Sequence, residues 1–292
     1  MKILYFGVHE QNAGWGAEHF INDGFNALGH TTHCIDYRKN RDTVYELYEK
    51  SPECDVLFLQ RGDDFPILIL EQFQGVKAFW VSELVSRCRD QDRLLKMHYL
   101  FNHIFFHTQA CITEAVVRFN IPVEKCSILL SGFDPNIYNK VEGIERKINI
   151  LYSGMSTPRR VKIIKQIAAH NKVHVSKAFG AELSHNMNQS KIVLNIHAED
   201  FLDTETRVFE TLGSGTFLLT EKLSQDSPFK NMIHYVEFEN IKELLWRIEY
   251  YLHNDGGRVE IAKQGFEEAH KNHTYVKRAE EIIKVFEEKV NG

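Results

Sequence analysis

Short apolar runs alternate with amphipathic stretches through the first half of the chain. The apolar runs predict strands at residues 2–8, 30–37, 54–60, 76–82, 103–108 and 127–132. Helical spacing of apolar residues predicts helices at 17–28, 41–50, 64–73, 91–101 and 109–119. The run 54–60 has a wholly apolar centre, which is typical of a strand buried on both faces of a parallel sheet. Alternating strands and helices therefore imply an α/β domain with a doubly wound parallel sheet.

The same pattern starts again in the second half. Further strands are predicted at 147–154, 172–179, 191–198 and 216–221, and helices at 160–170, 207–215 and 241–254. The tail from about 257 to 290 is helical and amphipathic. Residues 131–147 are rich in turn formers and charges and contain no periodic run, so we predict a first domain at 1–142 and a second from 143 onward.

Two Rossmann-like domains in one chain are expected to leave a cleft at the carboxyl ends of their strands, where open α/β sheets bind ligands. On fold alone, such a protein could be a glycosyltransferase, a periplasmic-type binding protein or a dehydrogenase.

Composition and charge limit the binding partners and the cellular compartment that we expect for this protein. The net charge is −5, which gives no global basic field for nucleic acid or for an anionic membrane. No apolar run reaches the roughly 18 residues of a membrane span, and the first apolar run is too short for a signal peptide. The five cysteines are scattered without metal-site or disulfide spacing, so we expect a cytoplasmic protein in a reducing compartment.

Residues 191–221 carry the most informative chemistry. An apolar strand leads through His197 into a helix on which Arg207 and Glu210, three residues apart, share one face. Gly213 and Gly215 follow, where glycine permits a left-handed turn or a close backbone approach. A glutamate there can accept from ribose hydroxyls, while an arginine and a helix N-terminus favour a diphosphate. The alternative is an exposed ion pair of Arg207 with Glu210 and a glycine that only ends the helix.

These residues also resemble a known family. The run RVFETLGSGTFLLTE, preceded by a strand ending in LN, resembles the donor-site segment of GT-B glycosyltransferases, specifically the CgeB-like (spore maturation protein) group within glycosyl transferases group 1. Three further segments resemble that group in the same order, namely LLSGFDPNIY at 129–138, ILYSGMSTPRR at 150–160 and HTYVKR at 273–278. The N-terminal part resembles the group only in general pattern.

The resemblance implies a GT-B fold and a metal-independent enzyme that moves a sugar from a UDP- or GDP-linked donor to an acceptor hydroxyl, without a cofactor. It implies that Glu210 holds the ribose and that Gly213 and Gly215 lie near the diphosphate. Arg159 or Arg160 would neutralise the departing diphosphate. The first domain would take the acceptor, residues 143–274 would bind the nucleotide sugar, and residues 275–292 would form a helix returning to the first domain. The broader family often has a second glutamate eight positions before the first, where this chain has Leu202.

The loop after the first strand leaves another function open. Gly14 and Gly16 resemble the start of a dinucleotide fingerprint, but His19 stands where a third glycine is expected. Asp36 lies about 20 residues further on, so an NAD-dependent oxidoreductase remains an alternative. In a glycosyltransferase the same loop would face the cleft and contact the acceptor or the diphosphate.

Three residues are candidates for the catalytic base. Glu83 follows an apolar strand, and Glu18 and His19 lie near the first loop; each could instead be a surface or capping residue. The Asp90-Gln91-Asp92 sequence does not end a strand, so it reads as a solvated helix start, and no metal site is expected. The acceptor stays open among polysaccharide, protein, small molecule and modified nucleic-acid base. A non-catalytic binding or assembly protein with the same fold is the first alternative to the enzyme.

Overall fold

The chain forms two compact units. The computed structural model describes residues 1–10, 16–86, 89–199 and 201–291. Unit 1 comprises Met1–Leu130 and Tyr275–Gly292, and unit 2 comprises Ser131–Thr274. Residues 131–142, expected in the first domain, thus belong to unit 2. No helix within the described ranges is both long and apolar enough to span a bilayer.

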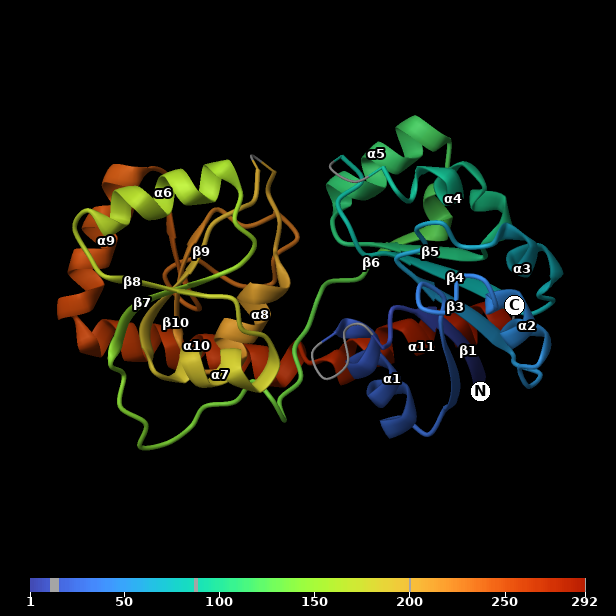
Figure 1. Ribbon diagram of the computed structural model, residues 1–292, viewed down its shortest axis with the longest axis horizontal. Coiled ribbons are helices and arrows are strands. Elements are labelled where there is room, and N and C mark those ends of the chain that lie inside the picture. Colours follow the sequence, from blue (N-terminus) through green and yellow to red (C-terminus); the bar gives the residue numbers. More distant parts are fainter. Residues whose placement is uncertain (11–15, 87–88, 200, 292) are drawn as a thin grey trace. The chain divides into compact units, whose positions relative to one another are not determined.

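Unit 1 is built on a six-stranded parallel sheet with the order β2-β1-β3-β4-β5-β6 (Figure 1). Its strands are β1 (Lys2–Gly7), β2 (Thr31–Asp36), β3 (Val56–Gln60), β4 (Val76–Val81), β5 (His103–Phe106) and β6 (Cys126–Ile128). Each overlaps a predicted apolar run. The strand order reverses between β1 and β3, which is where sheets of this kind leave a crevice for ligands.

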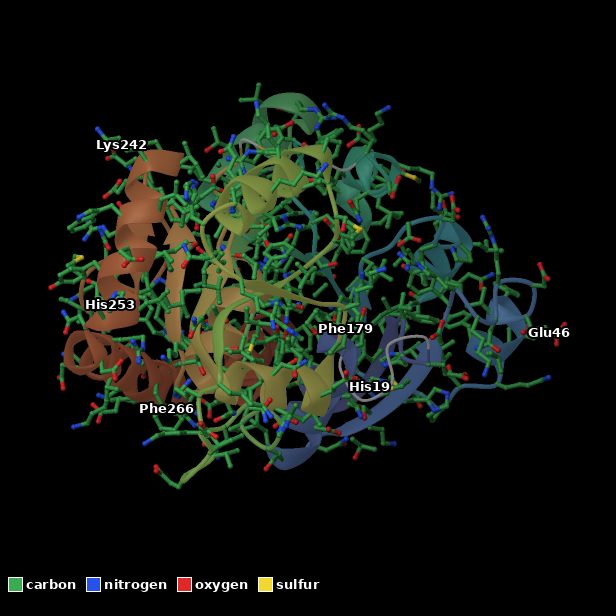
Figure 2. The ribbon with its side chains drawn as sticks, turned by 60° about the vertical axis from the view of Figure 1, so that its left-hand side comes forward. His19, Glu46, Phe179, Lys242, His253 and Phe266 are labelled. Carbon is green, nitrogen blue, oxygen red and sulfur yellow. The ribbon has the colours of Figure 1, made fainter. Side chains whose placement is uncertain are left out.

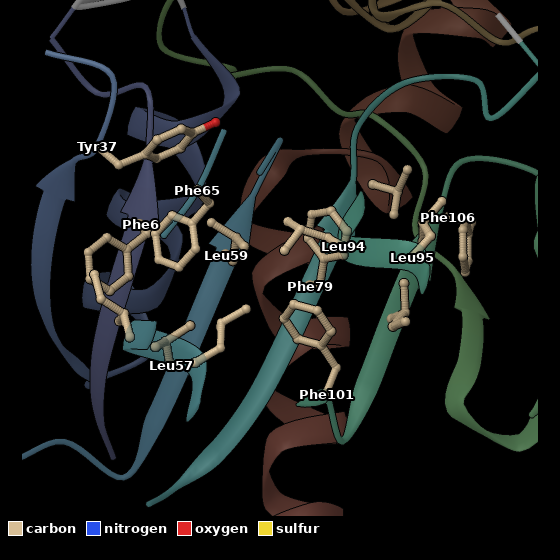
Figure 3. Packing of buried hydrophobic residues seen from close by; sticks show 14 of the residues in the cluster. Phe6, Tyr37, Leu57, Leu59, Phe65, Phe79, Leu94, Leu95, Phe101 and Phe106 are labelled. Carbon is tan, nitrogen blue, oxygen red and sulfur yellow. The ribbon is translucent and has the colours of Figure 1, made fainter. Parts of the chain in front are cut away.

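Helices cover both faces of this sheet. The helices on one face are α2 (Val44–Glu49), α3 (Ile67–Gln72), α4 (Asp92–Lys96) and α5 (Gln109–Phe119), with short 3₁₀ turns η1 (His98–Leu100) and η2 (Val123–Lys125). Their apolar side chains pack on Phe6, Leu59 and Phe79 of the strands (Figure 3). The other face contacts α1 (Ala17–Ala27) and α11 (Tyr275–Asn291). Alternate strand residues thus supply two separate cores.

Helix α11 is the element of unit 1 that comes from the far end of the chain. It lies against α1, and the ring of Phe286 contacts Phe25 of α1 and Phe58 of β3. Gly24 makes this approach possible, because a Cβ there would lie 2.7 Å from the Cβ of Ala279. The last helix is therefore part of the hydrophobic core of unit 1.

Unit 2 repeats the architecture with a five-stranded parallel sheet of order β11-β10-β9-β7-β8. Its strands are β7 (Ile148–Ser153), β8 (Val173–Ser176), β9 (Ser190–Asn195), β10 (Phe217–Glu221) and β11 (Val236–Phe238). Helices α6 (Pro158–Ala168), α9 (Ile241–His253) and α10 (Asp255–Asn272) pack on one core of the unit. Helices α7 (Gly180–Asn188) and α8 (Thr206–Gly213) contact β9 and its neighbours.

Local sequence explains where several of these helices begin. Thr157 accepts from the backbone N–H of Arg160 and precedes Pro158, so α6 has both a capping side chain and a proline at its first turn. Asn240 caps α9 in the same way through the N–H of Glu243. Lys242 and His253 mark the two ends of α9, and Phe266 lies on α10 (Figure 2).

The structure differs from the sequence prediction in several elements. Helix α7 and strand β11 were not predicted, because α7 is polar and begins with a glycine, and β11 is only three residues long. The predicted helical tail is two helices, α10 and α11, which are separated at His273 and Thr274. In unit 1, α2, α3 and α4 are each shorter than predicted.

Candidate functional site

A network of charged side chains joins the carboxyl ends of β7, β9 and β10. Arg159, in the first turn of α6, donates from Nη1 and Nη2 to the two carboxylate oxygens of Glu221, at 2.9 and 2.5 Å. Glu221, the last residue of β10, also accepts from the backbone N–H of His197 at 2.7 Å. Arg159 Nη1 donates in addition to the His197 carbonyl oxygen. Three segments therefore meet at the edge where open α/β sheets bind ligands.

Arg160 has a different position from its neighbour. It is buried, and its Nε donates to the Ile196 carbonyl oxygen at 2.7 Å. Its Nη2 donates to both carboxylate oxygens of Glu205, at 3.0 and 2.9 Å. Arg160 thus ties α6 to the loop after β9, whereas 30% of the Arg159 side chain is exposed. The neutralising role predicted for Arg159 or Arg160 stays a prediction.

His197 is buried between two carboxylates of the network. Its Nε2 lies 2.8 Å from the Lys222 carbonyl oxygen, which can only accept, so Nε2 carries the proton. Its Nδ1 is 3.7 Å from Oε1 of Glu205. Burial acts to lower the pKa of His197, but Glu205, the Lys222 carbonyl and Glu221 together raise that pKa above its usual 6.5.

Arg207 and Glu210 form a largely buried pair on α8. Arg207 Nη1 donates to Glu210 Oε2 at 2.6 Å, and the two side chains are 13% and 10% exposed. The exposed ion pair considered from the sequence is therefore wrong. Burial raises the pKa of Glu210, while the Arg207 charge and a hydrogen bond with Tyr138 act in the opposite direction. Arg207 Nε is buried, and no hydrogen-bond partner for it lies among the described residues.

Gly213 and Gly215 lie at the carboxyl end of α8, where they allow close packing. A Cβ on Gly213 would lie 2.4 Å from the ring of Phe133, so glycine is required for this contact. Gly215 has a φ of +64°, and its carbonyl oxygen accepts from Arg146 at 3.0 Å. Gly215 precedes the amino end of β10, so it lies away from the charged network. The contact with a diphosphate predicted for these glycines stays a prediction.

A second buried ion pair lies at the carboxyl ends of β1 and β3 in unit 1. Glu18 is fully buried, and its Oε1 accepts from Arg61 Nε at 2.5 Å. Gly7 allows this burial, because a Cβ there would lie 2.9 Å from Glu18 Cγ. Arg61 directly follows β3 with a φ of +69°, a conformation that non-glycine residues seldom adopt. Glu18 is thus enclosed and paired with Arg61, and its predicted role as a catalytic base stays a prediction.

The other candidates of unit 1 lie around this pair. Glu83 follows β4, is half-buried, and its charge acts on the pKa of Arg61. His19 Nε2 donates to the His9 carbonyl oxygen. Gly16 is the buried residue that precedes α1, and its carbonyl oxygen accepts from the N–H of His19. Gly14 lies outside the described residues. The catalytic roles of Glu83 and His19 stay predictions.

The structure weighs against the dinucleotide alternative. Both carboxylate oxygens of Asp36 accept backbone N–H groups, from Glu10 at 2.7 Å and from Arg38 and Lys39 at 3.1 and 2.9 Å. Asp36 therefore joins two loops instead of presenting its carboxylate to a ribose, which disfavours the dinucleotide alternative. Asp92 begins α4 and pairs with Arg118. Within the described ranges, no group of three or more metal-ligating side chains is placed to hold an ion.

Three residues of the two sites were not found from the sequence. Glu205 and Arg61 each form an ion pair with a residue more than 40 positions away, and Tyr138 is a buried residue that acts on the pKa of Glu210. The sequence feature that could have revealed Arg61 is its position as a positively charged residue directly after a strand with a wholly apolar centre. For Tyr138 it was the position at the end of a recognised motif.

Comparison with known proteins agrees with this architecture. Residues 145–284 match a family model described as "Glycosyl transferase-like". The structure of Anabaena Alr3699/HepE in complex with UDP and glucose is similar with a TM-score of 0.75 and 12% identity, over 98% of this chain and 99% of that one. A glycosyltransferase from Rickettsia africae has a TM-score of 0.75 and 10% identity, over 99% and 98% of the two chains.

A sucrose-phosphate synthase from Thermosynechococcus elongatus has a TM-score of 0.72 and 10% identity, over 98% of both chains. These similarities confirm the predicted fold class: the chain has a GT-B fold of two Rossmann-like domains. Over 72 residues, the chain is also 39% identical to "Uncharacterized protein R358" of Acanthamoeba polyphaga mimivirus, a match that spans 25% of that protein.

Proposed function

We propose that this protein is a glycosyltransferase that moves a sugar from a nucleoside-diphosphate sugar to an acceptor hydroxyl without an obligatory metal. The buried Arg207–Glu210 pair carries the proposal, because it combines an acceptor for ribose hydroxyls with a buried, unpartnered N–H among the described residues. The glycosyl transferase-like match covers the same residues, and similar structures hold UDP or UDP-glucose. We further propose that the protein belongs to the CgeB-like group and acts in the cytoplasm.

Unit 2 supplies groups suited to a UDP- or GDP-linked donor. Glu210 accepts from the ribose hydroxyls, and Arg207 Nε donates to an oxygen of the donor. Arg159 is better placed than Arg160 to stabilise the departing diphosphate, because its guanidinium is partly exposed and that of Arg160 is enclosed. A diphosphate there would share Arg159 with Glu221.

Unit 1 supplies the acceptor side in this proposal. Glu83 is the strongest candidate for the base that takes the proton of the acceptor hydroxyl, since Glu18 is enclosed and His19 Nε2 is engaged.

The first experiment is a thermal-shift screen with UDP, GDP, ADP, CMP, dTDP and NAD. UDP or GDP should raise the melting temperature of the wild-type chain. Glu210→Gln and Glu210→Ala should weaken binding of that diphosphate at least about tenfold, because each lost hydrogen bond to a charged group is worth about 1.5–3 kcal/mol. Glu249→Ala is the control, since it removes an exposed glutamate of unit 2.

The outcomes separate the proposed enzyme from its alternatives. A shift with NAD alone would replace the proposal with the oxidoreductase. Equal diphosphate binding by wild type and both folded Glu210 variants would remove the donor site from α8. Diphosphate binding without UDP release from UDP-sugars, in the presence of candidate acceptors, would favour the non-catalytic binding protein.

A further inference from the structure

A hollow of about 400 Å³ lies in unit 1 beside the carboxyl ends of β2 and β3. The loop after β2 lines it with Tyr37, Arg38 and Arg41, and the loop after β3 lines it with Asp63 and Asp64. Open α/β sheets bind ligands at the carboxyl ends of their strands, and small-molecule sites usually have volumes of about 300–1,000 Å³. None of these five residues belongs to the donor site proposed in unit 2.

A hydrogen-bonded network forms the inner wall of the hollow. Arg38 donates from Nε and Nη2 to the two carboxylate oxygens of Asp63, at 2.8 and 2.6 Å. The Tyr37 hydroxyl donates to Asp63 Oδ1 at 2.9 Å and accepts from the N–H of Gly62 at 3.1 Å. The buried ring of Tyr37 lies edge-on to Phe65 (Figure 3). A two-bond pair anchored in this way keeps its position before a ligand arrives.

The loop after β3 has an unusual backbone. Arg61, Gly62 and Asp64 have φ values of +69°, +79° and +55°. Such conformations persist only where the surrounding structure imposes them, and they cluster at ligand sites. Neighbouring side chains of an extended segment point to opposite sides, so this backbone explains how Asp63 and Asp64 both line one hollow.

The rim of the hollow is a second ion pair, which is open to solvent. Arg41 Nη2 donates to Asp64 Oδ2 at 2.7 Å, and the two side chains are 70% and 72% exposed. An exposed pair of this kind contributes little to stability, so a ligand can replace its bond at little cost. Val44 and Pro66 add a small apolar surface to the polar walls.

The charges and hydrogen-bonding groups of the hollow favour a neutral ligand rich in hydroxyls. Two guanidinium groups face two carboxylates, so an anion would meet carboxylates and a cation would meet guanidinium groups. The bonds described above use two of the five N–H groups of Arg38 and one of about four acceptor sites of Asp64. A hydroxyl both donates and accepts, so neighbouring sugar hydroxyls can bond a guanidinium and a carboxylate at once.

We propose that this hollow binds a sugar ring of the acceptor, and that the acceptor is therefore a carbohydrate. Binding of a sugar follows from the lining of the hollow alone, whereas the assignment of that sugar to the acceptor rests on the proposed function. A nucleic-acid acceptor fits poorly, because its phosphates would meet Asp63 and Asp64.

The first test measures sugar binding to the full chain by saturation-transfer NMR. The probes are the methyl glycosides of glucose, galactose, mannose, N-acetylglucosamine and rhamnose. At least one should bind wild type with a Kd on the order of 1 mM. Asp63→Asn should weaken that binding about tenfold, because it removes a charged partner of the hydroxyls and keeps the shape of the side chain. Binding of none of the sugars at up to about 50 mM would overturn the inference.

The rim offers variants that do not disturb the inner wall. Asp64→Asn keeps a residue type that tolerates a positive φ, and Arg41→Ala truncates an exposed side chain. Both should weaken sugar binding while the melting temperature of the free protein stays unchanged. Asp42→Asn is the matched control, since Asp42 is exposed in the same loop and is not among the residues that line the hollow. Wild-type binding in both rim variants and in Asp63→Asn would overturn the inference.

Inorganic phosphate tests whether the hollow instead binds an anion. A neutral sugar should bind with nearly the same Kd in about 0.05 and 0.5 M salt, whereas an anion held by Arg38 and Arg41 would bind more weakly in high salt. Phosphate that binds more tightly than every sugar, and loses binding in Arg41→Ala, would overturn the inference.

A transfer assay tests whether the bound sugar belongs to the acceptor. UDP or GDP release is measured from UDP-glucose, UDP-galactose or GDP-mannose, with oligosaccharides of the sugar that binds. In Asp63→Asn the KM for the oligosaccharide should rise about tenfold, with kcat and the KM for the donor near wild type. An unchanged KM for the oligosaccharide would overturn the assignment to the acceptor.

The results also separate this inference from the proposed function. If UDP or GDP binds through Glu210 and no sugar binds the hollow, the donor site stands and the inference fails. If a sugar binds through Asp63 and no nucleoside diphosphate binds, the sugar site stands and the proposed glycosyltransferase fails.

Discussion

Arg207 and Glu210 show how burial changes the meaning of two charges. Three residues apart on a helix, such a pair is worth little when exposed. Here both side chains are mostly buried, and the N–H at Arg207 Nε has no hydrogen-bond partner among the described residues. A buried donor of this kind is expected to find an acceptor oxygen when a ligand binds. Removing one partner of a buried pair leaves an uncompensated charge, which typically lowers the free energy of unfolding by about 3–5 kcal/mol. Because a Glu210 variant is expected to be less stable even without ligand, ligand binding should be judged from the rise in its own melting temperature when the diphosphate is added.

His197 should make the stability of unit 2 depend on pH. Its pKa is raised in the folded chain, so it contributes stability that is fully present below the ordinary pKa of about 6.5 and is lost as pH rises through the raised value. His197→Gln should therefore lose more unfolding free energy at about pH 5.5 than at about pH 8.5. Urea denaturation of both proteins at the two pH values measures this difference. A larger loss at high pH would contradict the charge environment described here.

Residue-level prediction from the sequence succeeded for neighbours and failed for distant partners. Helical spacing placed Arg207 and Glu210 on one face, but it could not tell that this face is buried. The pairing of Glu18 with Arg61 depends on β1 and β3 lying side by side and on Gly7 leaving room. Such contacts follow from tertiary packing, which the local pattern does not contain.

At the scale of elements, α8 is positioned by the segment that precedes the first strand of its own sheet. Residues 131–138 belong to unit 2, where Ser131 and Phe133 contact α8, so the division of the chain falls before the predicted boundary at 142 and 143. Strands were predictable because buried parallel strands are continuous apolar runs. Helix α7 was not, since its residues are largely polar and it starts at a glycine with a φ of +57°.

Gly213→Ala should destabilise unit 2 by about 1–3 kcal/mol, because the new methyl group would overlap the Phe133 ring. Gly256→Ala is the matched control. Gly256 lies in α10 with no atom within 4 Å of an added Cβ, so alanine there should be neutral or stabilising by up to about 1 kcal/mol. Thermal or urea unfolding of both variants gives the comparison. A Gly213 variant as stable as the Gly256 variant would show that Phe133 moves away freely.

At the scale of the whole molecule, the fold is two parallel-sheet units, each with the strand that comes first in its sequence one place in from an edge of the sheet. The restart of the strand–helix pattern predicted this architecture. It did not predict that the tail would break into α10 and α11, because both halves have helical spacing and no proline or glycine separates them. The partition of these helices between units is a tertiary property.

Phe286→Ala should destabilise unit 1 selectively. The ring is fully buried against Phe25 and Phe58, and truncating such a residue typically costs about 3–5 kcal/mol. Hydrogen exchange should show lower protection in β1 to β5 and unchanged protection in β7 to β10. Val290→Ala, at an exposed position of the same helix, is the control. Equal loss of protection in the two sheets would contradict the assignment of α11 to the core of unit 1.

The position of α11 also bears on the order in which the protein matures during translation. Unit 2 is contiguous, so all of its residues have been synthesised once the ribosome has passed Thr274. The first 130 residues of unit 1 must wait for Tyr275–Asn291, 17 residues that complete their core. At about 5–20 residues per second, synthesis of the intervening stretch takes roughly 7–30 s. During that interval α11 does not yet cover Phe25 and Phe58, so the nascent chain exposes aromatic surface of the kind that chaperones bind.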